Sequence, residues 1–93
     1  MSSADPQTIL YRRAPQWLHR LGNHKIILLQ RGSEPKEIRG IAVAVWLILE
    51  EPATLAQLSD EVAALSPDVP ASSLSEALDL MANQAIIELV QAP

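Results

Sequence analysis

The sequence GIAVAVWLIL at residues 40–49 decides how the rest of this chain can fold. Its nine apolar residues, Ile41 to Leu49, directly follow a glycine. A helix that is apolar on every side has to be buried on most of them. The run is also too short to cross a bilayer, which takes about 20 residues. It therefore predicts a short helix at the centre of the core, with Trp46 as its largest side chain.

The segment before this run has the patterns of three strands. Residues 17–21 alternate, with Trp17, His19 and Leu21 on one face. Residues 25–30 are apolar on both faces, which is typical of a central strand. Residues 36–39 form a short third strand, and the missing N–H of the proline before it suits an edge position.

The segment after the run has the patterns of two more helices. Thr54 and Gln57 match a capping box at the start of the first of them. Ser73 and Glu76 match a second one, and residues 85–90 form a short apolar tail, either a strand or a return against the core. The apolar stripes predicted to face the core are Leu55, Leu58, Val62 and Leu65 on one helix and Leu74, Leu78 and Met81 on the next.

Together these elements predict an α+β domain of winged-helix type, in which a three-stranded antiparallel sheet precedes three helices. A chain of 93 residues forms one domain at most. We expect residues 16–93 to be that domain and residues 1–15 to be a flexible arm. The apolar patch at residues 9–11 is either part of this arm or an additional edge strand.

The composition argues against catalysis and metal binding. The chain has no cysteine, and His19 and His24 are its only histidines. Its three glycines are isolated, so no phosphate-binding loop is present. We therefore expect a protein that is not an enzyme, with no cofactor and no metal. The first residues lack the pattern of a signal peptide, so we expect a cytoplasmic protein without membrane contact.

Charge is divided unevenly between the two halves. Residues 1–39 hold all seven basic residues and three acids, for a net +4, whereas residues 40–93 hold eight acids and no base. The helix at residues 73–84, which would read DNA in a winged-helix regulator, carries only acidic charge from Glu76 and Asp79. Because a polyanion repels such a helix, nucleic acid is not the expected ligand.

Three features of residues 16–90 resemble the PqqD-like family, which is named for pyrroloquinoline quinone biosynthesis protein D and is also called the RiPP recognition element. They are the order of strands and helices, the apolar run at residues 40–49, and its continuation EEPATLAQL at residues 50–58. The chain departs from the family at Ala85, where the family has glycine. Alanine adopts a left-handed cap poorly, so either Asn83 takes that role or the helix ends differently.

The resemblance implies a peptide chaperone. Such a protein binds the leader segment of a ribosomally synthesised precursor peptide and presents it to a modifying enzyme or a leader peptidase in natural-product biosynthesis. The leader adds as a strand beside the third strand and lies against the third helix. The residues that this places in the peptide site are Lys36, Glu37, Ile38, Arg39, Ser73, Ala77, Leu80 and Met81.

The residues themselves are compatible with this mode, since an edge strand is a template for strand addition. Lys36 and Arg39 favour an acidic leader. Leu80 lies off the core stripe, and either lines the peptide groove or packs under the sheet or the tail. The alternatives are a winged-helix transcription regulator, another protein-interaction domain, or an enzyme subunit without its own active site. An exposed strand edge also allows a homodimer.

Overall fold

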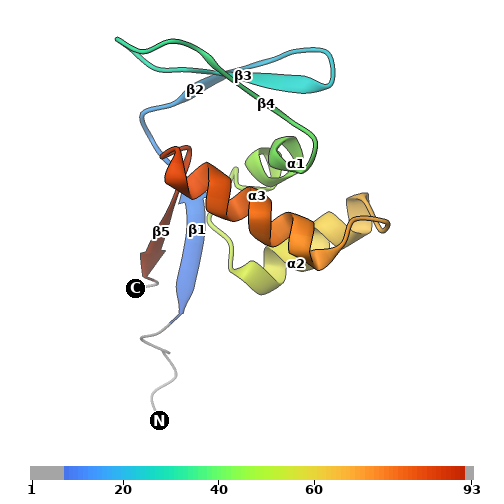
Figure 1. The fold of residues 1–93 in the computed structure, drawn as a ribbon. Helices are drawn as coiled ribbons and strands as arrows, with labels where there is room; N and C mark the ends of the chain where they lie inside the picture. Colours follow the sequence, from blue (N-terminus) through green and yellow to red (C-terminus); the bar gives the residue numbers. More distant parts are fainter. Residues whose placement is uncertain (1–7, 92–93) are drawn as a thin grey trace.

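The structure is a computed structural model that describes residues 8–91, and it has the predicted α+β architecture (Figure 1). One antiparallel sheet has the strand order β2-β3-β4, and a second, two-stranded sheet joins β1 to β5. The strands are β1 (Ile9–Arg13), β2 (Leu18–Leu21), β3 (Lys25–Leu29), β4 (Lys36–Arg39) and β5 (Ile87–Gln91). The helices are α1 (Ile41–Ile48), α2 (Leu55–Leu65) and α3 (Ala71–Asn83).

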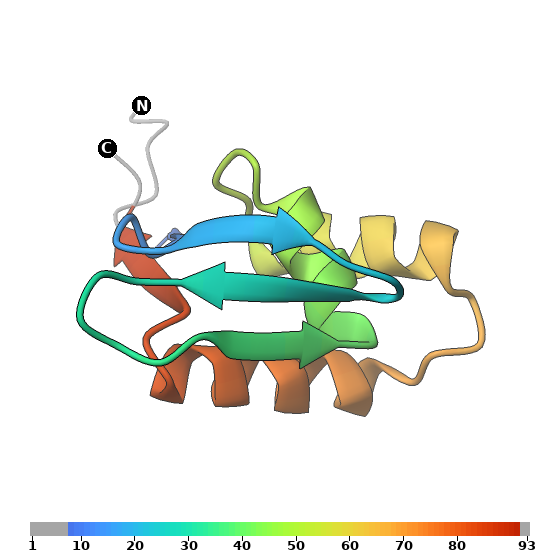
Figure 2. The same cartoon turned by 90° about the horizontal axis from the view of Figure 1, so that it is seen from above.

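The β2-β3-β4 sheet has helices on one side only (Figures 1 and 2). The inner residues Ile26, Leu28 and Ile38 are buried against these helices. Ile27 and Leu29, on the other face of β3, remain half-buried. The prediction of a central strand is confirmed, but its second apolar face is turned away from the helices.

Trp46 is the centre of the core, as predicted, and is 1% exposed. Arg13 donates a hydrogen bond from Nε to the Trp46 carbonyl oxygen at 2.8 Å, and its guanidinium lies 4.6 Å from the centroid of the indole. His19 meets the same indole edge-on at 5.8 Å between ring centroids. Burial lowers the pKa of Arg13, and the nearby charge of Glu50 opposes that shift. The sheet, β1 and α1 are thus joined around one side chain.

The strand β1 corrects the expected arm and agrees with the alternative of an additional strand at residues 9–11. Residues 1–7 lie outside the described residues, but Ile9–Arg13 pair with β5 along their whole length, from Ile9 opposite Gln91 to Arg13 opposite Ile87. Tyr11 also exchanges two backbone hydrogen bonds with Ala53, at 2.8 and 3.0 Å. This part of the predicted arm is therefore a strand of the folded domain, because the tail strand supplies a partner that sequence spacing did not reveal.

The helix starts agree with prediction at α2 and differ at α3. Thr54 and Gln57 form the predicted capping box. The second predicted capping box is wrong, because α3 begins at Ala71 with Pro70 as its N-cap, and Ser73 lies inside the first turn. The predicted stripe of α2 is half correct: Leu58 and Val62 are buried, whereas Leu55 and Leu65 at its two ends are exposed, since α2 packs against the core only along its middle.

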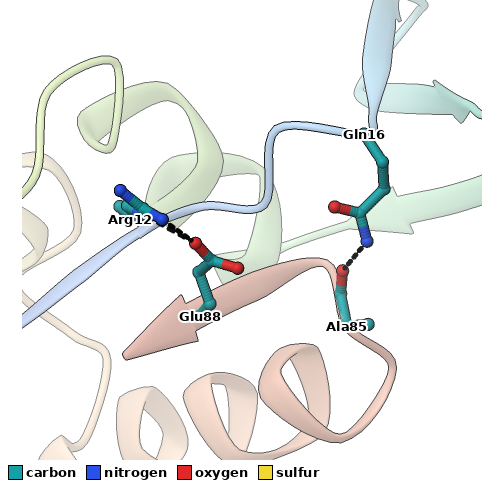
Figure 3. A network of polar contacts seen from close by, with 4 residues as sticks. All are labelled: Arg12, Gln16, Ala85 and Glu88. Atoms are coloured by element: carbon teal, nitrogen blue, oxygen red, sulfur yellow. Dashed lines mark hydrogen bonds and ion pairs between the residues drawn. The ribbon is translucent and has the colours of Figure 1, made fainter. Parts of the chain in front are cut away.

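The end of α3 is closed by Ala85, which has a φ of 59°. Ile86 N–H donates to Met81 O at 2.9 Å and Ala85 N–H to Ala82 O at 3.0 Å, which is the bonding pattern of a Schellman motif. Alanine itself therefore occupies the left-handed position, and neither sequence-based alternative was correct. The Ala85 carbonyl accepts from Trp17 Nε1 at 2.8 Å. It also accepts from Gln16 Nε2 at 3.2 Å (Figure 3), and the two bonds hold the turn in place.

Candidate peptide-binding site

The strand β4 is one of the two outer strands of its sheet and is paired on one side only, to β3. The hydrogen bond from Gly22 N–H to Lys25 O fixes which residues of β3 bond toward β2, namely the odd-numbered ones. Residues 26 and 28 therefore bond toward β4, where they face Ile38 and Lys36. It follows that the N–H and C=O groups of Glu37 and Arg39 point outward from the sheet.

The side chains of β4 divide between its two faces. Ile38 is buried on the inner face, and Lys36 shares that face because side chains alternate along a strand. Glu37 and Arg39 lie on the outer face, where Glu37 pairs with Arg39 and with Lys25 at 3.3 Å from Nζ. The hydrogen bond from Arg39 is the main cause of a lowered pKa at Glu37.

These pairs leave an excess of positive charge at the open edge. Two bases surround one acid on the outer face, for a net +1, and the ion pairs within residues 8–91 do not include Lys36. The prediction that both Lys36 and Arg39 attract an acidic peptide is refined by this arrangement. Arg39 is engaged with Glu37 on its own strand, so the uncommitted charge is that of Lys36.

Seen from above, α3 runs along the same side of the molecule as β4, and it lies one layer below the sheet (Figures 1 and 2). Its core stripe, Leu74, Leu78 and Met81, is buried as predicted. On one side of this stripe lies Ala82, which shares a small hollow with residues of β5. The row of Ser73, Ala77, Leu80 and Gln84 lies on the other side of the stripe, by helical geometry.

Burial separates the predicted peptide-site residues into two groups. Ser73 and Ala77 are half-buried, and Leu80 is 58% exposed, so the alternative in which Leu80 packs into the core is wrong. Met81 is 2% exposed and Ile38 is buried, so both side chains belong to the core beneath this surface. The residues accessible to a ligand are Lys36, Glu37, Arg39, Ser73, Ala77 and Leu80.

The sheet has a second open edge, at β2, which was not considered as a candidate site from the sequence. By the same bonding pattern, His19 and Leu21 direct their backbone groups outward there. Leu18 and Leu21 are exposed large apolar side chains on this strand. Any three-stranded sheet has two edges, so the predicted sheet already implied a second edge strand. The order β2-β3-β4 identifies that strand as β2.

Within residues 8–91, no three His, Asp or Glu side chains gather closely enough to hold a metal ion. None of the helices in this range is long and apolar enough to cross a membrane. Comparison of the chain with protein-family models, with curated proteins and with solved structures finds no match in any of the three.

Proposed function

We propose that this protein binds the leader segment of a ribosomally synthesised precursor peptide and presents it to a modifying enzyme or a leader peptidase. The observation that carries the proposal is the open edge of β4, and the partly exposed row on α3 supports it. An extended peptide added to β4 would take main-chain hydrogen bonds from Glu37 and Arg39 and place alternate side chains over Ala77 and Leu80. The resemblance of residues 16–90 to the PqqD-like family supports the same mode.

The length of β4 bounds what strand addition can contribute. The strand has four residues, and the outward-facing groups come from two of them. So few backbone bonds give modest affinity, because each hydrogen bond adds only about 0.5–1.5 kcal/mol net. We therefore expect apolar contact with Leu80 and Ala77 to supply most of the remaining affinity, and Lys36 to favour a peptide with an acidic residue nearby.

A proline substitution in β4 tests the proposal directly. Glu37→Pro removes an N–H that points out of the sheet, and leaves the hydrogen bonds between β3 and β4 in place. Titration calorimetry with a synthetic leader peptide should show clearly weaker binding by the variant than by the natural chain. Circular dichroism should show that the variant stays folded.

The matched control is Leu21→Pro, which removes an outward N–H from the other open edge, at β2. This variant should bind the leader as the natural chain does. If Leu21→Pro loses binding and Glu37→Pro keeps it, the peptide adds to β2 and the proposed site is wrong. If both variants bind normally, the protein does not recognise leaders by strand addition.

A further inference from the structure

A separate hollow lies between the end of α1 and α2, with a volume of about 770 Å³. This is within the usual range for binding sites, about 300–1,000 Å³. Its apolar lining includes Leu47, Ile48 and Leu65. Leu47 and Leu65 are 49% and 65% exposed, so two large apolar side chains face solvent in a single open depression. Contact between water and these exposed leucines is unfavourable, so a complex in which a partner covers them is stabilised.

The border of the hollow carries only acidic charge. Glu50, Glu51, Asp60 and Glu61 all line it, and no basic residue does. Within residues 8–91, none of these four carboxylates takes part in an ion pair. Arg13 is near enough to feel the charge of Glu50, but its Nε–H is bonded to the Trp46 carbonyl. An apolar floor with a purely acidic border is complementary to a ligand that is apolar in the middle and basic around it.

We propose that this hollow binds an amphipathic basic helix of a partner protein. The walls are α1, α2 and the segment at residues 50–53 between them. The backbone groups of the helices are bonded within each helix, and those of Ala53 are already bonded to Tyr11, so an extended peptide finds no open strand edge here. A helix supplies its own backbone bonds and inserts apolar side chains at spacings of three and four. Two such side chains would cover Leu47 and Leu65, and flanking lysines or arginines would meet the four carboxylates.

The position of the hollow makes this a second docking surface, independent of the peptide site proposed at β4. Figure 2 shows α2 and the segment between α1 and α2 on one side of the molecule, with α3 and β4 on the other. The two surfaces also have opposite charge, since Lys36 leaves the β4 edge basic and the hollow is acidic. A partner bound in the hollow would leave β4 free.

The test uses the full chain and a synthetic helical peptide in which leucines recur at spacings of three and four and every other position is lysine. Titration of ¹⁵N-labelled protein at low salt should shift the amide signals of residues around Leu47, Ala64 and Leu65. Leu65→Ser should weaken binding roughly tenfold, because it removes the most exposed apolar contact. Glu61→Lys should weaken it about fivefold, with the remaining affinity less sensitive to salt.

Two matched variants serve as controls. Leu55→Ser removes a leucine that is 48% exposed on the same helix but does not line the hollow, and should bind normally. Glu76→Lys makes the same charge change on α3 and should also bind normally. Both control variants keep the buried residues of α2 and α3, so we expect them to fold. Their thermal stability is the reference for that of Leu65→Ser and Glu61→Lys.

Four results would overturn the proposal. The first is equal binding of a peptide with the same composition in scrambled order, which would reduce the effect to general charge attraction. The second is a set of shifted signals located elsewhere, for example around Leu80. The third is no binding at low salt. The last is a salt-sensitive oligomer of the chain alone that Leu65→Ser dissolves, which would show a second copy in the hollow.

Discussion

The helices α1 and α3 both bury side chains in the core, but α1 is apolar on every side whereas α3 is amphipathic. α1 packs against β4, α2 and α3, and its eight residues include no charged side chain. α3 packs against α1, α2 and β5, and keeps a partly exposed row, Ser73, Ala77, Leu80 and Gln84, beside its buried stripe. α1 therefore holds the fold together, whereas α3 has one side available for a ligand.

The exposure of a side chain, and not its hydrophobicity, therefore distinguishes the candidate binding positions from the structural ones. Leu80 and Met81 are neighbours of nearly equal hydrophobicity, and yet one is 58% and the other 2% exposed. A one-residue step on a helix turns a side chain by about 100°, which is enough to move it from core to surface. The following substitutions probe each helix at its centre, its ends and its open side.

Trp46→Ala should have the largest effect, because it empties the centre of α1. We expect a loss of about 3–5 kcal/mol in the free energy of unfolding, measured by urea titration followed by circular dichroism. Trp46→Phe keeps most of the volume and removes an indole N–H that has no hydrogen-bond partner among residues 8–91, so it should cost clearly less. Equal losses in the two variants would contradict the packing role of the ring.

Gly40→Ala should destabilise the start of α1 by about 1–3 kcal/mol. Gly40 has φ 61° and ψ −133°, a conformation open to glycine and strained for any other residue. No heavy atom lies within 4 Å of a Cβ added at Gly40, so backbone strain is the only cause of the expected loss of stability. Thermal denaturation measures the loss. Gly22→Ala, at a glycine whose φ is not positive, should cost less, since its added Cβ meets only the flexible Lys25 side chain, at 3.0 Å, and a reversed order would rule out this explanation.

Ala85→Gly should stabilise the protein by about 1 kcal/mol, since it relieves the left-handed alanine at the end of α3. A gain of this size raises the melting temperature of a domain this small by roughly 4–8 °C. Ala82→Gly, the same change inside the helix, should instead lower stability because glycine is unfavourable there. Opposite signs for the two variants are the expected result, and two losses would show that Ala85 is not strained.

Leu80→Asp should have the smallest effect on stability, about 0.5 kcal/mol, because the side chain is exposed. It should abolish binding of a leader peptide in titration calorimetry, since a carboxylate in the site has to lose its water without gaining a partner. Met81→Asp is the contrasting variant and should unfold the protein. Normal leader binding by Leu80→Asp would place the peptide elsewhere.

Much of the fold was predictable because its signals are local. The apolar run at residues 41–49, the Thr54 capping box and the three strand patterns each follow from a few adjacent residues. Pro35 marked β4 as an edge strand, and the sheet order agrees. The capping box at Ser73 failed because the serine and glutamate spacing also occurs inside a helix that Pro70 has already started.

The candidate site was predictable only in outline. Helical spacing separated Leu80 from the core stripe, and the structure shows it exposed. The same spacing did not exclude Met81, which was assigned both to the core and to the site and lies in the core. The hollow between α1 and α2 was not predicted at all, because Leu65 had been placed on the buried stripe of α2.

The sequence by itself determined most local elements of this protein: the three strands of the main sheet, the three helices, where an acidic half follows a basic one, and that Trp46 would centre the core. These follow from periodicity, capping and charge within short stretches. Only the tertiary structure decided that β1 pairs with β5, that Ala85 takes a left-handed turn under Trp17 and Gln16, and that Leu65 is left exposed. Each of these depends on a partner that is distant in sequence, and no local pattern encodes which distant surface comes to cover a residue.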